Sequence, residues 1–216
     1  MAKRAGVAPI LLTGFAPFDG AAINPSWEVA RALHGRQIAG VSVIAAALPV
    51  AFELALPSLQ DLIAQHRPQL VVSLGLAAGR AAISLERVAI NLIDARIADN
   101  LGAQPVDEPV LQDAPAAYFA TLPIKAMRRA IEIEGVPAEI SYTAGTFVCN
   151  QVMFAALHFS HALTPAVRAG LIHLPWSTGL GEPALDLAVM VHAIEQALTV
   201  ALHTQSDLLE AGGTTH

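Results

Sequence analysis

The chain has 216 residues, of which 54% are hydrophobic and 14% are charged, and its formal net charge at pH 7 is −6. It contains no cluster of lysine and arginine to neutralise phosphates, so its composition argues against a nucleic-acid partner. A single cysteine excludes an internal disulfide and favours a reducing compartment, the cytoplasm.

Hydrophobic periodicity alternates between that of strands and that of helices along the chain. The elements predicted in chain order are a strand at 10–13, a helix that Asn24 caps and Pro25 begins, a strand at 41–47, a helix at 52–65, strands at 70–74 and 88–93, a helix at 124–134, a strand at 138–142, a helix at 150–162, a strand at 170–174 and a helix at 184–203. This alternation predicts an α/β fold, a three-layer α/β/α sandwich with a mixed, mainly parallel sheet. We expect one domain over residues 1–216.

Several segments carry no clear period. Residues 94–117 are rich in Asn, Asp, Gly and Pro and predict a long functional loop, and residues 211–216 predict a disordered tail. The N-terminal end is basic, but Gly14 and Pro17 interrupt the apolar segment after it, so we expect no signal peptide. The apolar stretch 41–56 is shorter than the roughly 20 residues of a membrane span. The high hydrophobic share favours contacts between subunits.

Cys149 stands at the start of a predicted helix, within the sequence Thr-Phe-Val-Cys-Asn-Gln. The free N–H groups and the positive dipole end at the start of a helix stabilise a thiolate, which is the reactive form of cysteine. A lone cysteine among apolar neighbours is also typical of inert packing in a core. The position therefore indicates a nucleophile if a base and a group that orients the base lie nearby.

Two residues are candidates for these supporting roles. His173 lies near the end of the strand predicted at 170–174, and strand periodicity turns its imidazole away from the face that its two apolar neighbours share. Its alternative role is that of a hydrogen-bonded core histidine. Glu86, which we expect in a loop at a strand end, is the candidate to orient the base. Its alternative role is an exposed ion pair with Arg80 or Arg87.

Five blocks of sequence carry specific motifs. They are Leu-Thr-Gly-Phe-Ala-Pro-Phe at 12–18 with Asn-Pro-Ser-Trp-Glu at 24–28, Gly-Arg at 79–80 with Glu-Arg-Val-Ala-Ile-Asn at 86–91, Asp-Ala-Arg-Ile-Ala-Asp-Asn at 94–100, Thr-Ala-Gly-Thr-Phe-Val-Cys-Asn at 143–150, and Ile-His-Leu-Pro at 172–175. In order and spacing these blocks resemble the pyroglutamyl peptidase I family, also called pyrrolidone-carboxylate peptidases. The resemblance covers most of the chain, and the block that ends in Cys149 and Asn150 is specific enough to indicate the family by itself.

The resemblance implies a catalytic triad of Cys149, His173 and Glu86. The implied reaction removes an N-terminal pyroglutamyl residue from peptides through a thioester intermediate, with no cofactor and no metal. It also implies a homo-oligomer, either a dimer or a tetramer. The family's pocket for the lactam ring maps onto Phe15, Phe18, Ile97, Phe147 and Val148. Arg96 maps near the developing oxyanion, beside the backbone N–H of the cysteine.

Phe15 and Phe18 also suit an uncharged lactam on chemical grounds. The ring carries no charged amine, so its pocket needs aromatic and aliphatic walls and neutral hydrogen-bond partners. We expect both side chains in an exposed Gly/Pro-rich loop after the first strand, where two large aromatic rings need a reason. The alternative is that they pack into the core.

The sequence departs from common choices of the family at five positions. These are Leu76 in place of glutamine, Val50 in place of threonine, Ala78 in place of glycine, Gln151 in place of histidine and Trp176 in place of tyrosine. The loss of polar groups at positions 50 and 76 predicts weaker hydrogen bonding around the substrate. The three residues of the implied triad are unchanged, so we expect the reaction type to be kept.

Other motifs carry less weight. The segment 75–80 follows a strand as phosphate loops do, but it lacks their Gly-Lys-Ser/Thr ending. His158 and His161 lie on one predicted helix without a third metal ligand, so a solvated or partly buried helix face is the preferred interpretation. By residue type alone, Asp94 and Asp99 are rivals of the glutamate for orienting the base.

Two other functions stay open at this point. One is a different Cys-His amidohydrolase on the same fold, which acts on another small lactam or amide. The other is a binding protein that keeps the pocket without catalysis.

Overall fold

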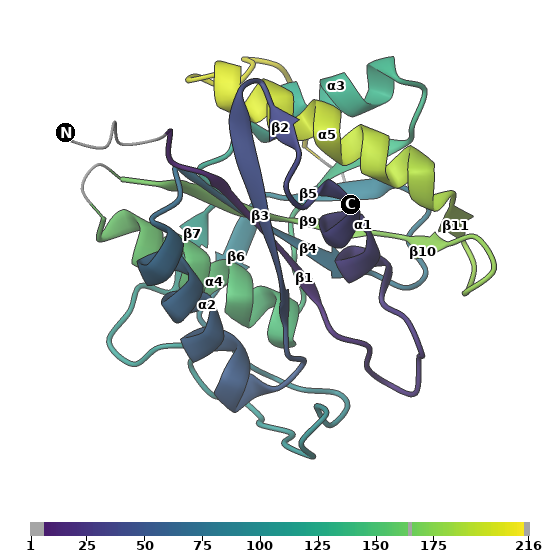
Figure 1. The fold of residues 1–216 in the computed structure, drawn as a ribbon. Coiled ribbons are helices and arrows are strands. Elements are labelled where there is room, and N and C mark those ends of the chain that lie inside the picture. The colour runs from purple at the N-terminus through teal and green to yellow at the C-terminus, as the bar shows by residue number, and fades with distance from the viewer. Residues whose placement is uncertain (1–6, 164–165, 214–216) are drawn as a thin grey trace.

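The computed structural model describes residues 7–163 and 166–213 and has a central twisted sheet with helices on both sides (Figure 1). Seven strands form this sheet in the order β2-β3-β1-β4-β9-β5-β8. Their bounds are Ile10–Phe15 for β1, Gln37–Ile38 for β2, Val41–Leu48 for β3, Leu70–Leu76 for β4, Ile83–Glu86 for β5, Ala138–Ser141 for β8 and Arg168–Leu174 for β9.

In the part of the chain that the structure describes, five helices cover the two faces of the sheet. Their bounds are Pro25–Leu33 for α1, Phe52–His66 for α2, Ile124–Ile133 for α3, Val148–His161 for α4 and Leu187–His203 for α5. Helices α1, α3 and α5 pack on one face, and α2 and α4 pack on the other (Figure 1). Each face buries its own apolar cluster, which explains why the central strands read as nearly continuous apolar runs. The predicted three-layer α/β/α sandwich is confirmed.

The direction of the strands decides which residues meet. Strands β3, β1, β4 and β9 are parallel, so their carboxyl ends meet at one edge of the sheet. Strand β2 is antiparallel to β3, and β5 is antiparallel to β9 and parallel to β8. Two small sheets lie outside, formed by β6 (Val88–Ile90) with β7 (Ala117–Phe119) and by β10 (Trp176–Ser177) with β11 (Ala184–Leu185). The mixed, mainly parallel sheet agrees with the prediction.

Three predicted bounds need correction. The strand predicted at 88–93 ends at Ile90, and the strand β5 before it was not predicted. Helix α4 begins at Val148, two residues earlier than predicted. Helix α5 begins at Leu187 and not at 184, because the side chain of Asp186 accepts a hydrogen bond from the Ala188 N–H at 2.8 Å and caps the helix there.

The predicted long loop lacks regular structure from residue 91 to residue 116, apart from one bridge between Ile93 and Glu108. The predicted disordered tail differs from the structure at Gly212, whose carbonyl accepts a hydrogen bond from the Tyr142 hydroxyl at 2.9 Å. Residues 214–216 of that tail, and the basic start of the chain, lie outside the described residues.

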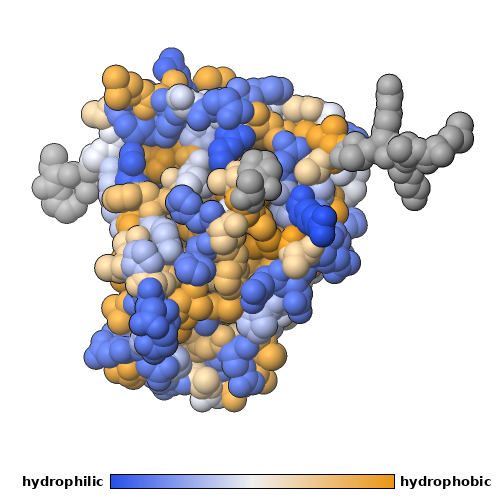
Figure 2. Space-filling model, turned by 90° about the vertical axis from the view of Figure 1, so that its left-hand side faces the viewer, coloured by the Kyte–Doolittle hydropathy of each residue, from blue (hydrophilic) through white to orange (hydrophobic). Residues whose placement is uncertain are grey.

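No helix within residues 7–163 and 166–213 has the length and apolar character needed to cross a bilayer. The apolar stretch 41–56 instead forms β3 and the start of α2. Figure 2 shows apolar side chains gathered between polar ones on the side of the molecule that lies at the left of Figure 1. A hollow at the amino ends of β1, β4 and β9 has a lining that includes Ala8, Ile63, Pro68, Leu163 and Val167. The candidate residues lie elsewhere, toward the carboxyl ends of the same strands.

Candidate active site

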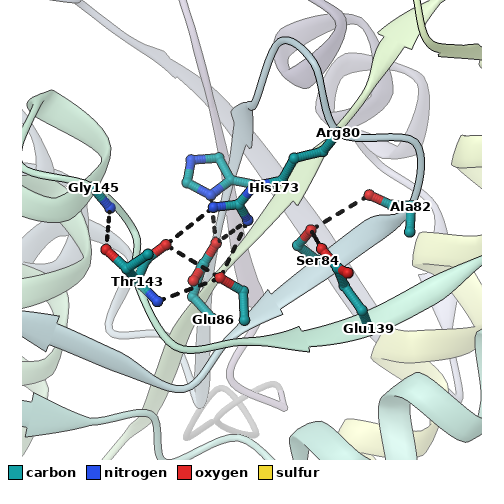
Figure 3. A network of polar contacts seen from close by, with 9 residues as sticks. Arg80, Ala82, Ser84, Glu86, Glu139, Thr143, Gly145 and His173 are labelled. Atoms are coloured by element: carbon teal, nitrogen blue, oxygen red, sulfur yellow. Dashed lines mark hydrogen bonds and ion pairs between the residues drawn. The ribbon is translucent and has the colours of Figure 1, made fainter. Parts of the chain in front are cut away.

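His173 and Glu86 are buried side by side on neighbouring strands (Figure 3). The Nδ1 atom of His173 lies 2.7 Å from the Oε1 atom of Glu86, and the two residues are 4% and 0% exposed. Ile172 and Leu174 pack into the cluster beneath α1, α3 and α5, so the imidazole faces the α4 side as predicted. The pair therefore lies in a dry environment where its electrostatic interaction is strong.

The structure corrects the expected position of Glu86. Glu86 is the last residue of β5 and not part of a loop, and β5 runs antiparallel to β9. The alternative role, an ion pair with Arg80, is also present, with 2.7 Å between Arg80 Nη1 and Glu86 Oε1. It is not an exposed pair, because the carboxylate is fully buried. One oxygen of Glu86 therefore serves both the histidine and the arginine.

Cys149 is the second residue of α4, and its sulfur lies close to the imidazole of His173. Gly75 on β4 shows how closely the two side chains approach. A Cβ atom at position 75 would lie 3.0 Å from Cys149 Sγ, 3.0 Å from His173 Nε2 and 2.8 Å from His173 Cδ2. Only a residue without a side chain leaves room there for the sulfur and the imidazole to meet.

The protonation of His173 is biased by its two neighbours. Burial by itself would lower the pKa of His173, but hydrogen bonds and charge interactions with Cys149 and Glu86 outweigh it and raise that pKa to about 9. These neighbours therefore favour the protonated form of the imidazole. A protonated imidazole between a sulfur and a carboxylate can stabilise a thiolate on one side while the other side fixes the ring.

Asn150, which follows the cysteine, connects the start of α4 to β6 through side-chain hydrogen bonds. Its Oδ1 atom accepts a hydrogen bond from the Ile90 N–H at 3.0 Å, and its Nδ2 atom donates to the carbonyls of Ile90 and Leu92 at 2.8 and 3.0 Å. The side chain is 1% exposed, so all three bonds are shielded from water. These bonds set where α4 begins and thus where Cys149 stands.

Asp94 and Asp99 have other partners than the histidine. The carboxylate of Asp99 accepts hydrogen bonds from the N–H groups of Phe52, Leu101 and Ala103 at 2.8, 2.9 and 2.9 Å. Burial would raise the pKa of Asp99, but these backbone donors lower it. Asp94 is exposed and is tied to Thr146 through its backbone. Asp99 thus organises the loop and the start of α2, and Glu86 is the acid in contact with the base.

A pocket opens next to the cysteine. Its lining consists of Phe15, Phe18, Asn24, Val50, Leu76, Phe147, Val148 and Cys149. Four of the five predicted pocket residues are therefore brought together. Ile97 lies instead in an adjoining hollow, which it shares with Asp94 and Arg96 and which Phe18 and Phe147 separate from the pocket. The predicted place of Arg96 near an oxyanion stays a prediction.

Phe15 differs from its expected position. It ends β1 and is 2% exposed, so it does not lie in an exposed loop. Its N–H donates to the Ser26 hydroxyl at 3.0 Å, and the Asn24 side chain accepts from that hydroxyl at 2.8 Å and donates to the Ala16 carbonyl at 3.1 Å. These bonds fix the chain between β1 and α1. The ring packs in the core and also forms a wall of the pocket. The predicted pocket role and the alternative of core packing are therefore both met by this residue.

Comparison with known proteins gives this site a family. A family model described as pyroglutamyl peptidase matches residues 8–204. The chain belongs to the pyroglutamyl peptidase family. The pyrrolidone-carboxylate peptidase of Klebsiella pneumoniae is 50% identical over 215 residues, covering 97% of this chain and 100% of the relative. That of Pectobacterium atrosepticum is 47% identical over 212 residues, covering 96% and 99%.

Solved structures of the pyroglutamyl peptidase family share the fold. Pyroglutamyl peptidase I of Bacillus amyloliquefaciens matches with a TM-score of 0.89 and 40% identity, covering 93% of this chain and 100% of that one. Pyrrolidone carboxyl peptidase from Thermococcus litoralis matches with a TM-score of 0.88 and 40% identity, covering 91% and 94%. The resemblance found in the sequence is confirmed, and the chain is an enzyme of the class of cysteine-type omega peptidases.

The positions that depart from the family's common choices fall into two groups. Val50 and Leu76 line the pocket, where they add apolar wall. Gln151 is buried outside the pocket lining; its Nε2 atom donates to the Phe52 carbonyl at 2.9 Å, and its Oε1 atom has no partner among the described residues. Trp176 packs against Gly181, and Ala78 is exposed in the turn after β4. Only the first group changes the surface that a substrate would meet.

The two helical histidines lie away from this site. His158 Nδ1 is 2.9 Å from the Tyr118 hydroxyl, on the partly buried face of α4 toward β7. In the part of the chain that the structure describes, no group of three or more His, Cys, Asp or Glu side chains is arranged to hold a metal ion.

Two residues of the site were not predicted in their roles: Gly75 was part of a weak resemblance to a phosphate loop, and Arg80 was only a possible partner of Glu86 in an exposed ion pair. A glycine inside an otherwise apolar strand was the available signal, since it marks a close approach of another group.

Proposed function

We propose that this chain is a cysteine exopeptidase that removes an N-terminal pyroglutamyl residue from peptides. One observation carries the proposal. The buried His173 contacts Glu86 through Nδ1, and its Nε2 atom and the sulfur of Cys149 both lie against Gly75, next to a pocket with aromatic walls. The family to which the chain belongs supports the same reaction.

The proposed chemistry begins with attack of the Cys149 thiolate on the pyroglutamyl carbonyl. The imidazolium of His173 then gives its Nε2 proton to the leaving amine, the amide bond breaks and a thioester remains. His173, now neutral, takes a proton from water, whose hydroxide attacks the thioester and releases pyroglutamate. Glu86 holds the Nδ1 side of the ring throughout, so that Nε2 faces the reacting atoms.

The pocket supports an uncharged substrate group. Its lining side chains are aromatic or aliphatic, apart from the cysteine and Asn24, whose amide is already engaged with the chain around it. A lactam ring without a charged amine would leave no unpaired charge buried against these side chains. An α-ammonium group would lose its hydration there and find no carboxylate among the lining residues.

The setting of the enzyme is part of the same proposal. A catalytic thiol stays reduced in the cytoplasm, which makes that compartment the natural place for this enzyme. We also propose a homo-oligomer, a dimer or a tetramer, for which the large hydrophobic share of the sequence is the supporting observation.

Release of a chromophore from amides of pyroglutamate, alanine and proline tests the function. We expect turnover of the pyroglutamyl amide alone, and loss of that turnover after treatment with iodoacetamide. Turnover of a different small lactam or amide would instead identify another Cys-His amidohydrolase. Tight binding of pyroglutamate without any turnover would identify a binding protein.

A further inference from the structure

Arg80 connects three segments of the active site (Figure 3). Its Nη1 atom donates to Glu86 Oε1 on β5 at 2.7 Å and to the Ser141 hydroxyl at the end of β8 at 3.2 Å. Its Nη2 atom donates to the Thr143 carbonyl at 3.1 Å, in the segment that leads into α4. The guanidinium thus contacts both the acid that holds the base and the chain that carries the nucleophile.

Glu86 needs such a partner. Its carboxylate is fully buried, Oε1 is shared by His173 and Arg80, and Oε2 has no hydrogen-bond partner among the described residues. A buried carboxylate with one free oxygen can turn about its own side-chain bonds unless a second contact fixes it. The short, charge-assisted bond from Arg80 supplies that contact and decides which oxygen faces the imidazole.

The segment at Thr143 is a compact turn stabilised by its own bonds. The Ser141 hydroxyl donates to the Thr143 carbonyl at 3.2 Å, and the Thr143 hydroxyl accepts from the Gly145 N–H at 3.1 Å. Arg80 joins this turn through the same carbonyl. The planar guanidinium has donors pointing in several fixed directions, whereas the point charge of a lysine reaches one of these partners at a time.

We propose that Arg80 is a positioning residue of this active site, which locks Glu86 and the chain segment before Cys149 into one arrangement. The proposal rests on the proposed function, because it assigns a role within the same triad. Arg80 acts through Glu86 and the turn and does not touch the reacting atoms.

The test compares Arg80→Met with Arg80→Lys and with a matched control, Arg36→Met. Arg36 also forms an arginine–glutamate pair, at 3.1 Å with Glu195, but on the surface at α5. For Arg80→Met we expect kcat on the pyroglutamyl amide to fall roughly 10- to 100-fold, as a misplacement of about 1 Å would cause, with KM changed less than about two-fold. Arg80→Lys should recover part of this loss, and Arg36→Met should behave as wild type.

Chemical rescue separates positioning from general destabilisation. The Arg80 side chain is 28% exposed, so a small cation from solvent can reach its site. Methylguanidinium at millimolar concentration should restore part of the kcat of Arg80→Ala, whereas sodium chloride at equal ionic strength should not. A loss of kcat that follows the thermal unfolding midpoint in every variant, without rescue, would overturn the proposal.

Alkylation of Cys149 by iodoacetamide at neutral pH gives a measurement independent of the substrate. We expect Arg80→Met to slow it several-fold, because the imidazolium that supports the thiolate is no longer held in place. If wild type cleaves no pyroglutamyl amide, the proposed function fails while this measurement still tests Arg80. Unchanged alkylation and unchanged kcat in Arg80→Met would show that Arg80 has no positioning role.

Discussion

At the His173 end of the candidate active site, side chains are held by charged hydrogen bonds, whereas at the pocket end they are held by packed rings. The histidine, Glu86 and Arg80 are joined by contacts of 2.7 Å. On the other side of the cysteine, the ring of Phe147 lies 5.1 Å from that of Phe52 in a T-shaped arrangement and 6.3 Å from that of Phe18. The first end therefore depends on charge and exact donor position, and the second on shape and apolar area.

This contrast predicts two kinds of mutational effect. Changes at the polar end should lower kcat, because they alter the groups that act on the reacting bond. Changes at the pocket should lower kcat/KM for pyroglutamyl substrates and leave the reactivity of the thiol unchanged. The following variants test the contrast from the largest expected effect to the smallest.

Replacing the nucleophile should have the largest effect. Cys149→Ser should lower kcat roughly 10³-fold or more, because a serine hydroxyl is far harder to ionise than a thiol. Circular dichroism should show an unchanged fold, since the two side chains differ little in size. Near-native turnover by this variant would remove the cysteine mechanism.

Gly75→Ala should come next. A methyl group at this position would lie 2.8 to 3.0 Å from atoms of His173 and Cys149 and would force the two apart, so we expect kcat to fall about 100-fold. Iodoacetamide should also alkylate the thiol more slowly. Gly212→Ala is the matched control, because a Cβ there meets nothing closer than 3.6 Å. An equal fall in kcat in both variants would show that the missing side chain at Gly75 is not needed for the approach of His173 and Cys149.

Glu86→Gln tests the charge at the polar end. The carboxylate helps to raise the pKa of His173 to about 9. The imidazolium form of His173, which protonates the leaving amine, is therefore present below that pH and is lost as pH rises through it. We expect the wild-type activity to fall on the alkaline side near pH 9. In the variant, kcat should drop roughly 10- to 100-fold and the fall should move to lower pH, with KM nearly unchanged.

Asp99→Asn is the control for this prediction. Its carboxylate accepts backbone hydrogen bonds at the start of α2, so the variant should lose on the order of 1 kcal/mol of folding stability. The pH at which activity falls should stay at the wild-type value. If that pH moves in Asp99→Asn and stays fixed in Glu86→Gln, Asp99 and not Glu86 governs the base.

Phe15→Ala should have the smallest effect on catalysis. At about 25 cal/mol per Å², the lost contact with a lactam ring is worth roughly 1–2 kcal/mol, which corresponds to about a ten-fold fall in kcat/KM. The alkylation rate of the thiol should not change. Because the ring is 2% exposed, the variant should also unfold at a lower temperature. Ile97→Ala, in the adjoining hollow, should lower kcat/KM less; an equal or larger effect would move the substrate into that hollow.

The sequence predicted the features that depend on neighbouring residues along the chain. The alternation of strands and helices, the start of a helix at the cysteine and the side of β9 to which His173 points follow from periods of two and 3.6 residues. The structure bears out each of these, with shifts of a few residues at the ends of elements. The family was also readable, because its motifs are short and continuous.

Only the tertiary structure decided which of these residues meet. Strand β5 lies between β9 and β8, antiparallel to the first and parallel to the second, and this arrangement brings Glu86 beside His173 and Arg80 beside Thr143. The requirement for a glycine at position 75 also comes from side chains on two other elements. Local periods cannot encode such contacts, because they depend on the order and direction of strands that are distant in sequence and become neighbours only in the folded sheet.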